Sequence, residues 1–124
     1  SMVLAVLESR CGISFGGQDV YLNIAGGLRI SEPAADLAVA AALISAREDI
    51  AIASDTVIFG EISLSGALRP ISQAENRLKE AEKLGFSAAF APSRMKLSSE
   101  SGMKVQKFEA IDGFVEDCFG AIDA

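Results

Sequence analysis

The segment from residue 56 to residue 64 constrains the fold most, because it reads as a strand that is apolar on both faces. Its sequence is TVIFGEISL, in which large apolar residues occupy neighbouring positions instead of alternating with polar ones. This pattern is typical of a strand whose sheet is covered on both sides. We therefore expect a sheet with helices packed against it.

Helical spacing of apolar residues predicts four helices. The alanine-rich second helix has Leu37, Ala40, Ala41 and Ile44 on one face, which predicts a buried stripe. The third begins with S-x-x-E, a capping box formed by Ser72 and Glu75. The expected helices cover residues 2–11, 32–48, 72–84 and 111–119.

Shorter apolar runs predict further strands around the helices. They cover residues 13–15, 20–25, 68–71, 88–91 and 103–108, the first two joined as a hairpin. This order of elements predicts an α/β (α+β) domain of two layers, with a mixed sheet packed by helices. A chain of 124 residues suffices for one domain. We expect a single domain over residues 1–124, in which residues 1–11 are the end of a linker helix.

Composition excludes several kinds of site. Histidine is absent, so the chain cannot build a Ser-His-Asp triad, a Cys-His pair or a histidine-ligated metal site. Cys11 and Cys118 are too few for a four-ligand zinc site, and we expect both to be reduced thiols. The nucleotide-binding patterns G-x-G-x-x-G and G-x-x-x-x-G-K-[ST] are also missing. We therefore expect no cofactor and no metal in this chain.

Charge and hydropathy limit the partners and the compartment that we expect for this protein. The net charge is −6, which argues against strong non-specific DNA binding by the isolated chain. No signal peptide is visible, and charged residues break every apolar run before it reaches the length of a membrane span. We expect a cytoplasmic protein without a membrane partner.

Three stretches carry a family resemblance that extends over roughly residues 2–122. The most specific residues are Gly26-Gly27-Leu28-Arg29, the run from Pro33 to Ala38, and Gly60-Glu61-Ile62 followed by Gly66 and Arg69-Pro70. The chain resembles the proteolytic domain of Lon proteases and, more closely, the Lon-like C-terminal domain of RadA-type (Sms) DNA repair proteins. The resemblance implies a Lon-like fold.

The resemblance also implies that peptidase chemistry has been lost. Active Lon peptidases carry a serine in a P-S-A-G motif, and Ala34 stands at that position here. Their lysine base matches Glu75. An alanine has no oxygen for attack and a carboxylate cannot replace the amine, so the resemblance predicts a non-catalytic domain. RadA-type domains share this departure from the Lon pattern.

The family further implies a longer parent protein. That parent is expected to carry a four-cysteine zinc motif and a RecA-like ATPase core, so ATP, Mg and Zn belong outside this chain. It is expected to act as an ATP-driven branch-migration motor in recombination. The Lon-like domain is expected to build a homo-oligomeric ring, a hexamer, and to line a path for DNA.

DNA contact in such a ring would need cationic side chains. Residues 75–107 contain seven positive and four negative charges, which makes this region locally basic. The candidate nucleic-acid contacts are Arg29, Arg69 and Arg77.

Two other functions stay open. Gly26-Gly27 beside a strand edge predicts a module that binds a peptide without cleaving it. A peptidase with displaced residues would pair Ser31 or Ser72 with Lys79, and the lysine would have to be desolvated to act as the base.

Overall fold

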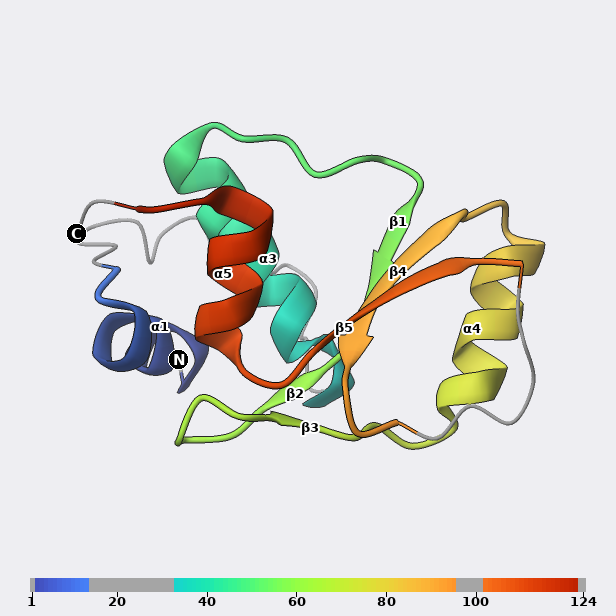
Figure 1. Cartoon of the computed structure of the whole chain (residues 1–124), viewed down its shortest axis with the longest axis horizontal. Coiled ribbons are helices and arrows are strands. Elements are labelled where there is room, and N and C mark those ends of the chain that lie inside the picture. The colour runs from blue at the N-terminus through green and yellow to red at the C-terminus, as the bar shows by residue number, and fades with distance from the viewer. Residues whose placement is uncertain (1, 14–32, 96–101, 123–124) are drawn as a thin grey trace.

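A computed structural model describes residues 2–13, 33–95 and 102–122 of the chain (Figure 1). Four α-helices and five short strands lie in these ranges, with a single 3₁₀ turn before the second helix. The elements are α1 (Met2–Cys11), η2 (Pro33–Ala35), α3 (Asp36–Glu48), β1 (Thr56–Ile58), β2 (Glu61–Ile62), β3 (Leu68–Arg69), α4 (Ala74–Lys83), β4 (Ala88–Pro92), β5 (Lys104–Phe108) and α5 (Ile111–Phe119).

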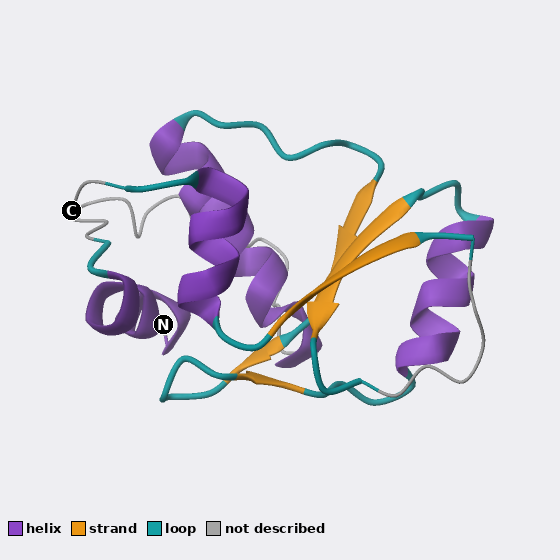
Figure 2. Cartoon of the chain, in the orientation of Figure 1, coloured by secondary structure: helices purple, strands orange, loops and turns teal. Residues whose placement is uncertain are grey.

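The described strands form one parallel sheet and one antiparallel pair. The parallel sheet has the order β1-β4-β5, and Val57, Ala89 and Val105 lie side by side across it. The antiparallel pair joins β2 to β3, with Glu61 opposite Arg69. Figure 2 shows the parallel sheet between α4 and the other helices. The predicted α/β class, with both parallel and antiparallel strands, is confirmed.

Alternation of side chains explains why helices cover both faces of the parallel sheet. Val57, Ala89 and Val105 point to the same face and pack with Leu78 of α4 in a small core. Phe90 points to the opposite face, toward the larger core. The helices therefore lie on two sides of the sheet, which is one layer more than the two-layer arrangement expected from element order.

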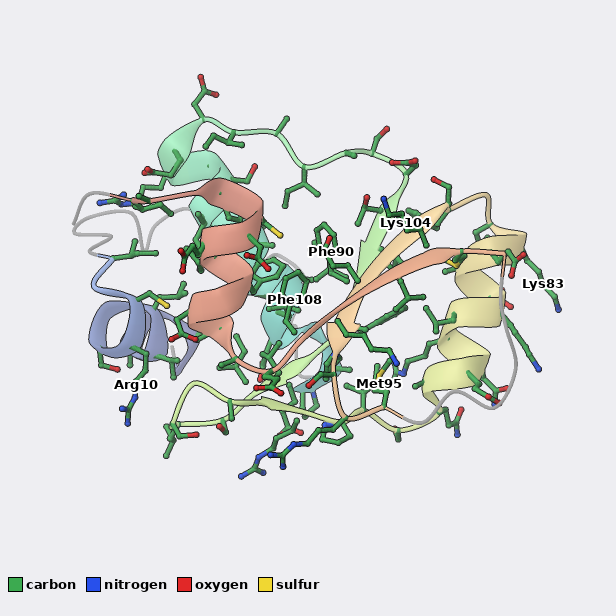
Figure 3. The ribbon with its side chains drawn as sticks, viewed as in Figure 1. Arg10, Lys83, Phe90, Met95, Lys104 and Phe108 are labelled. Carbon is green, nitrogen blue, oxygen red and sulfur yellow. The ribbon has the colours of Figure 1, made fainter. Side chains whose placement is uncertain are left out.

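The larger core joins α1, α3 and α5. Its fully buried side chains include Leu7, Leu37, Ile44, Ile111 and Phe114. The stripe predicted on the alanine-rich helix is thus confirmed, since Ala40 and Ala41 are also fully buried. Phenylalanine rings form a second feature of this core, and Phe90 and Phe108 lie beside each other at its centre (Figure 3).

The prediction of one continuous strand over residues 56–64 is wrong, because the chain leaves the parallel sheet at Gly60. The Phe59 amide still donates to the Phe90 carbonyl, at 2.9 Å. The next amide, that of Gly60, donates instead to the carbonyl of Ala34, and the Gly60 carbonyl accepts from the amide of Leu37. These two bonds fasten the chain to the start of α3, so that β2 pairs in a separate sheet.

The predicted capping box at Ser72 is also wrong. The N-cap of α4 is Gln73, whose backbone is left-handed (φ 54°) and whose side chain makes no capping bond. The helix therefore begins one residue later than a Ser72 cap requires. Helices α1 and α5 agree with prediction, whereas the helix predicted over residues 32–48 is α-helical only from Asp36, after the 3₁₀ turn Pro33–Ala35. Gly12 (φ 68°) follows α1 as the expected stop. The expected hairpin over residues 13–25 lies almost entirely outside the described residues.

Candidate functional site

The carboxyl ends of β4 and β5 meet the β2–β3 pair around an open hollow. Parallel strands present their carboxyl ends at one edge, which is where open α/β sheets commonly bind ligands. Arg94 follows β4, Glu109 follows β5, and Arg69 ends β3. All three line a hollow of about 460 Å³, which we call the arginine hollow.

A second hollow, of about 530 Å³, adjoins the first. It shares Pro70 and Arg94 with the arginine hollow and reaches Glu75 in the first turn of α4. Met95 forms part of its wall and is buried beneath the sheet (Figure 3). Arg94 therefore stands between two connected depressions, with Arg69 on one side and Glu75 on the other.

The structure places the three predicted DNA contacts differently. Arg69 is exposed and lines the arginine hollow. Arg77 lines a separate groove between α4 and β1, and its Nε donates to the Ser72 carbonyl at 3.0 Å. Arg29 lies outside the described residues. The arginine that joins Arg69 is Arg94, which the sequence analysis did not single out.

The two positions that match the Lon dyad lie in different surroundings. Ala34 belongs to η2 and is 6% exposed, with its carbonyl bonded to the amide of Gly60 at 2.9 Å. Glu75 is half-buried and faces the second hollow. In the alternative pairing of Ser31 or Ser72 with Lys79, both Ser72 and Lys79 are exposed to water, and Ser31 lies outside the described residues.

Asp36 connects α3 to β2 through a bond that sequence reasoning missed. Its Oδ2 accepts a hydrogen bond from the amide of Ile62, at 3.0 Å. Partial burial raises the pKa of the Asp36 carboxyl above its ordinary value, the Ile62 amide opposes this rise, and the nearby charge of Glu61 adds to it. Asp36 also places a negative charge in the first turn of α3, where the helix dipole favours it.

The thiols lie in the larger core, away from the hollows. Cys11 and Cys118 are both unpaired and half-buried, so the prediction of free thiols is confirmed. Burial raises the pKa of Cys118 to about 11, and the charge of Asp117 contributes to the rise. Thiols of this kind are poor nucleophiles at neutral pH.

Two other kinds of feature are absent from the described ranges. Across residues 2–13, 33–95 and 102–122, no three His, Cys, Asp or Glu side chains gather as metal ligands would. Within the same part of the chain, no helix has both the length and the apolar character needed to cross a bilayer.

Comparison with known proteins gives the family. A family model described as "Subunit ChlI of Mg-chelatase" matches residues 2–95. The chain is 67% identical over 93 residues to DNA repair protein RadA of Brucella abortus. This match covers 75% of the chain and 20% of the relative. It is 48% identical over 103 residues to DNA repair protein RadA of Synechocystis, covering 83% of the chain and 20% of the relative.

A third relative matches similar shares of both chains. DNA repair protein RadA of Rickettsia typhi is 58% identical over 86 residues, which is 69% of the chain and 19% of that protein. The chain thus spans about a fifth of the length of the curated relatives it matches. The resemblance to RadA-type proteins is confirmed. The chain belongs to the family described as subunit ChlI of Mg-chelatase and is homologous to one segment of the longer DNA repair protein RadA.

Proposed function

We propose that this chain is a non-catalytic, Lon-like module of a RadA-type DNA repair protein, and that its arginine hollow contacts DNA phosphates. The observation that carries the proposal is the meeting of Arg69 and Arg94 at one hollow, from strands far apart in the sequence. A guanidinium group can bond a phosphate through two parallel N–H donors, so paired arginines suit this ligand. The names of the relatives support a role in DNA repair.

Contact with DNA through this hollow is weak in a single copy. Glu109 shares the hollow with the two arginines, and the whole chain carries a charge of −6. Both features oppose a polyanion, and few phosphates can be reached from two arginines. In a ring, equal sites repeat around the centre and their contributions combine through multivalency. We therefore assign the module a second role, as part of the scaffold of a homo-oligomeric ring, with six copies as the expected number.

The absence of peptidase activity is the other half of the proposal. The methyl group of Ala34 offers no nucleophile, and Glu75 offers a carboxylate where the resemblance implies an amine. The displaced pair is unsuitable because a lysine base must be desolvated, and Lys79 is exposed. Losing either member of such a unit removes most of the rate.

We propose that the other functions of the parent protein belong to segments outside this chain. The relatives are about five times as long as the matched segment. We propose that a RecA-like core outside this segment binds ATP and Mg, that a separate four-cysteine motif binds Zn, and that branch migration takes place on DNA in the cytoplasm.

Fluorescence anisotropy of a short labelled DNA duplex, titrated at several salt concentrations, tests the DNA-contacting role. Arg69→Ala with Arg94→Ala should weaken binding and reduce the salt slope by about 2, because each lost phosphate contact removes close to one released ion. The matched control is Lys83→Ala with Lys104→Ala, which removes the same charge from two exposed positions outside the hollow. Equal loss in both variants would show that only net charge matters and would contradict a specific role for the hollow.

A serine-directed activity probe tests the non-catalytic half. The folded chain should remain unlabelled, with an active serine peptidase as the positive control. Labelling that disappears in Ser72→Ala or Lys79→Ala would favour the displaced pair and overturn this part of the proposal.

A further inference from the structure

The pair Asp112-Gly113 is the only place in the sequence where an aspartate is followed by glycine. Every other aspartate precedes a residue with a side chain, and Asn23 and Asn76 precede isoleucine and arginine. A side chain on the following residue hinders attack by its backbone nitrogen on the aspartate carboxyl group, whereas glycine permits a close approach. The sequence therefore singles out this pair for succinimide chemistry, in which a side-chain carboxyl reacts with the next backbone amide.

The structure brings the two reacting groups together. The side chain of Asp112 folds over the following peptide, and the amide of Gly113 donates a hydrogen bond to its Oδ1 at 2.9 Å. The carbon that carries this oxygen, Cγ of Asp112, therefore lies beside the amide nitrogen of Gly113. A bond between these two atoms would close a five-membered ring.

The nitrogen of Gly113 is not committed to the hydrogen bonds of the helix. Helix α5 begins at Ile111, and its ladder starts with the amide of Phe114, which donates to the Ala110 carbonyl at 3.2 Å. The amide of Gly113 precedes this bond and belongs to the first turn, where amides have no partner within the helix. Movement of this nitrogen toward the carboxyl group consequently breaks no bond of the helix.

Space and water are both available at this position. Asp112 and Gly113 are exposed, although they belong to a helix whose other face is buried. A Cβ built on Gly113 would meet nothing within 4 Å, so no neighbouring side chain crowds the peptide that would enter the ring. Water can therefore reach a ring formed here and open it.

We propose that Asp112 is a site of spontaneous isoaspartate formation in the folded chain. The Gly113 nitrogen gives its proton to solvent and bonds to Cγ of the protonated carboxyl group, whose hydroxyl leaves as water. Water then adds to one of the two ring carbonyls and breaks its bond to nitrogen. Opening at Cγ restores aspartate, whereas opening at the main-chain carbonyl leaves the backbone running through the side chain. One water is lost and one is regained, so the rearrangement needs no other reactant.

Isomerisation at this position should disturb the larger core. The new linkage adds one methylene to the backbone between Ile111 and Phe114, both of which are fully buried. The start of α5 is also bonded to the turn after β2, since the Ile111 amide donates to the Gly66 carbonyl at 2.8 Å. Close-packed interiors respond to changes of a single methylene. We therefore expect the isomerised chain to be less stable, an effect that does not depend on the DNA-contacting or scaffold roles.

Ageing of the 124-residue chain tests the site. The chain is incubated for weeks in mildly acidic buffer, with and without urea, and isoaspartate is detected by an isoaspartate-directed methyltransferase with labelled methyl donor and located by peptide mapping. Label should accumulate at Asp112 in the native chain at a rate comparable with that in urea. Asp55 and Asp117 are exposed but precede threonine and cysteine, so they serve as internal controls and should stay unlabelled. Accumulation in urea without accumulation in buffer would show that α5 protects the pair and would overturn the proposal.

Two variants separate this reaction from ageing elsewhere. Gly113→Ala adds a methyl group that hinders the nitrogen, and Asp112→Glu would require a six-membered ring. Both should reduce the label in the native chain several-fold or more. Label that persists in both variants would also overturn the proposal.

A urea titration of the separated isoaspartate fraction measures the structural consequence. Its midpoint should lie below that of unaged chain, and that of Gly113→Ala should not fall during the same incubation. Equal midpoints for the isoaspartate fraction and the unaged chain would contradict the expected disturbance of the core.

Discussion

Asp36 accepts a hydrogen bond from the backbone amide of Ile62, at 3.0 Å, and so joins the first turn of α3 to β2. Ile62 is 1% exposed, so its amide has no access to water as an alternative partner. The bond crosses 26 positions of sequence and lies next to the turn at Gly60. It is therefore one of the contacts that hold the β2–β3 pair against the larger core.

Replacement of Asp36 should reveal this contact through its pH dependence. Because the pKa of Asp36 is raised in the folded state, its contribution to stability is complete below the pKa of the unfolded chain and is lost as pH rises through the folded pKa. Asp36→Asn keeps an oxygen acceptor and has no charge to desolvate. Urea titrations at acidic and at neutral pH should show that the free energy of unfolding of Asp36→Asn, relative to that of the wild type, increases as the pH rises.

Asp36→Ala is the matched control for that experiment. It removes the acceptor and leaves a buried amide unsatisfied, which should make it about 1–3 kcal/mol less stable than Asp36→Asn at all pH values. An alanine variant as stable as the asparagine variant would contradict a role for the hydrogen bond.

Gly60 should not tolerate a side chain. A Cβ at this position would lie 3.2 Å from Cβ and 3.3 Å from Cδ2 of Leu37, which is fully buried. We expect Gly60→Ala to lower the free energy of unfolding by about 1–3 kcal/mol through overpacking. Gly113→Ala in α5 meets nothing within 4 Å and should raise stability by up to about 1 kcal/mol. Similar effects at both positions in denaturant titrations would show that close packing at Gly60 is unimportant.

Phe114 should be the most costly aromatic residue to truncate. Its ring centroid lies 5.1 Å from that of Phe108, 5.8 Å from Phe90 and 6.2 Å from Phe119, all edge-on. It is fully buried, so Phe114→Ala should cost about 3–5 kcal/mol. Leu84→Ala, at an exposed position, should change stability by less than about 0.5 kcal/mol at low protein concentration. If Phe114→Ala lost as little stability as Leu84→Ala, the phenyl ring of Phe114 would not be central to the core.

The two thiols should react slowly in the native chain. With a pKa of about 11, Cys118 holds its proton at pH 8, and burial also raises the pKa of Cys11, with a smaller contribution from Asp112. The thiolate is the reactive form. A chromogenic disulfide reagent at pH 8 should therefore modify both thiols far faster in urea than in buffer, and the native rate should rise toward pH 10. Equal rates in the two solvents would show that the thiols are accessible.

Local sequence pattern predicted the helices well and failed where long-range bonds decide the conformation. The spacing of Ile111, Phe114 and Val115 predicted α5 because one apolar face meets one core. The break at Gly60 depends on the carbonyl of Ala34 and the amide of Leu37, which no window around residue 60 contains. At the start of α4, the left-handed backbone of Gln73 replaced the cap that S-x-x-E predicts.

For the same reason, only one of the two arginines in the arginine hollow was predicted from the sequence. Arg69 was predicted because it lies near the helix that carries Glu75, the position of the Lon base, and it lines the arginine hollow. Arg94 lies just after β4, and only the pairing of strands brings it near Arg69. Arg77 was predicted for the same reason, but it lines the separate groove between α4 and β1. Whether Ala34 and Glu75 mark a former catalytic pair stays a prediction.

The parallel sheet divides the apolar interior unequally, and this has a consequence for motion. Helix α4 contributes only Leu78 and Ala81 to the small core, whereas three helices share the large one. Amide protons of α4 should accordingly exchange with solvent through a partial opening that leaves α3 and α5 intact.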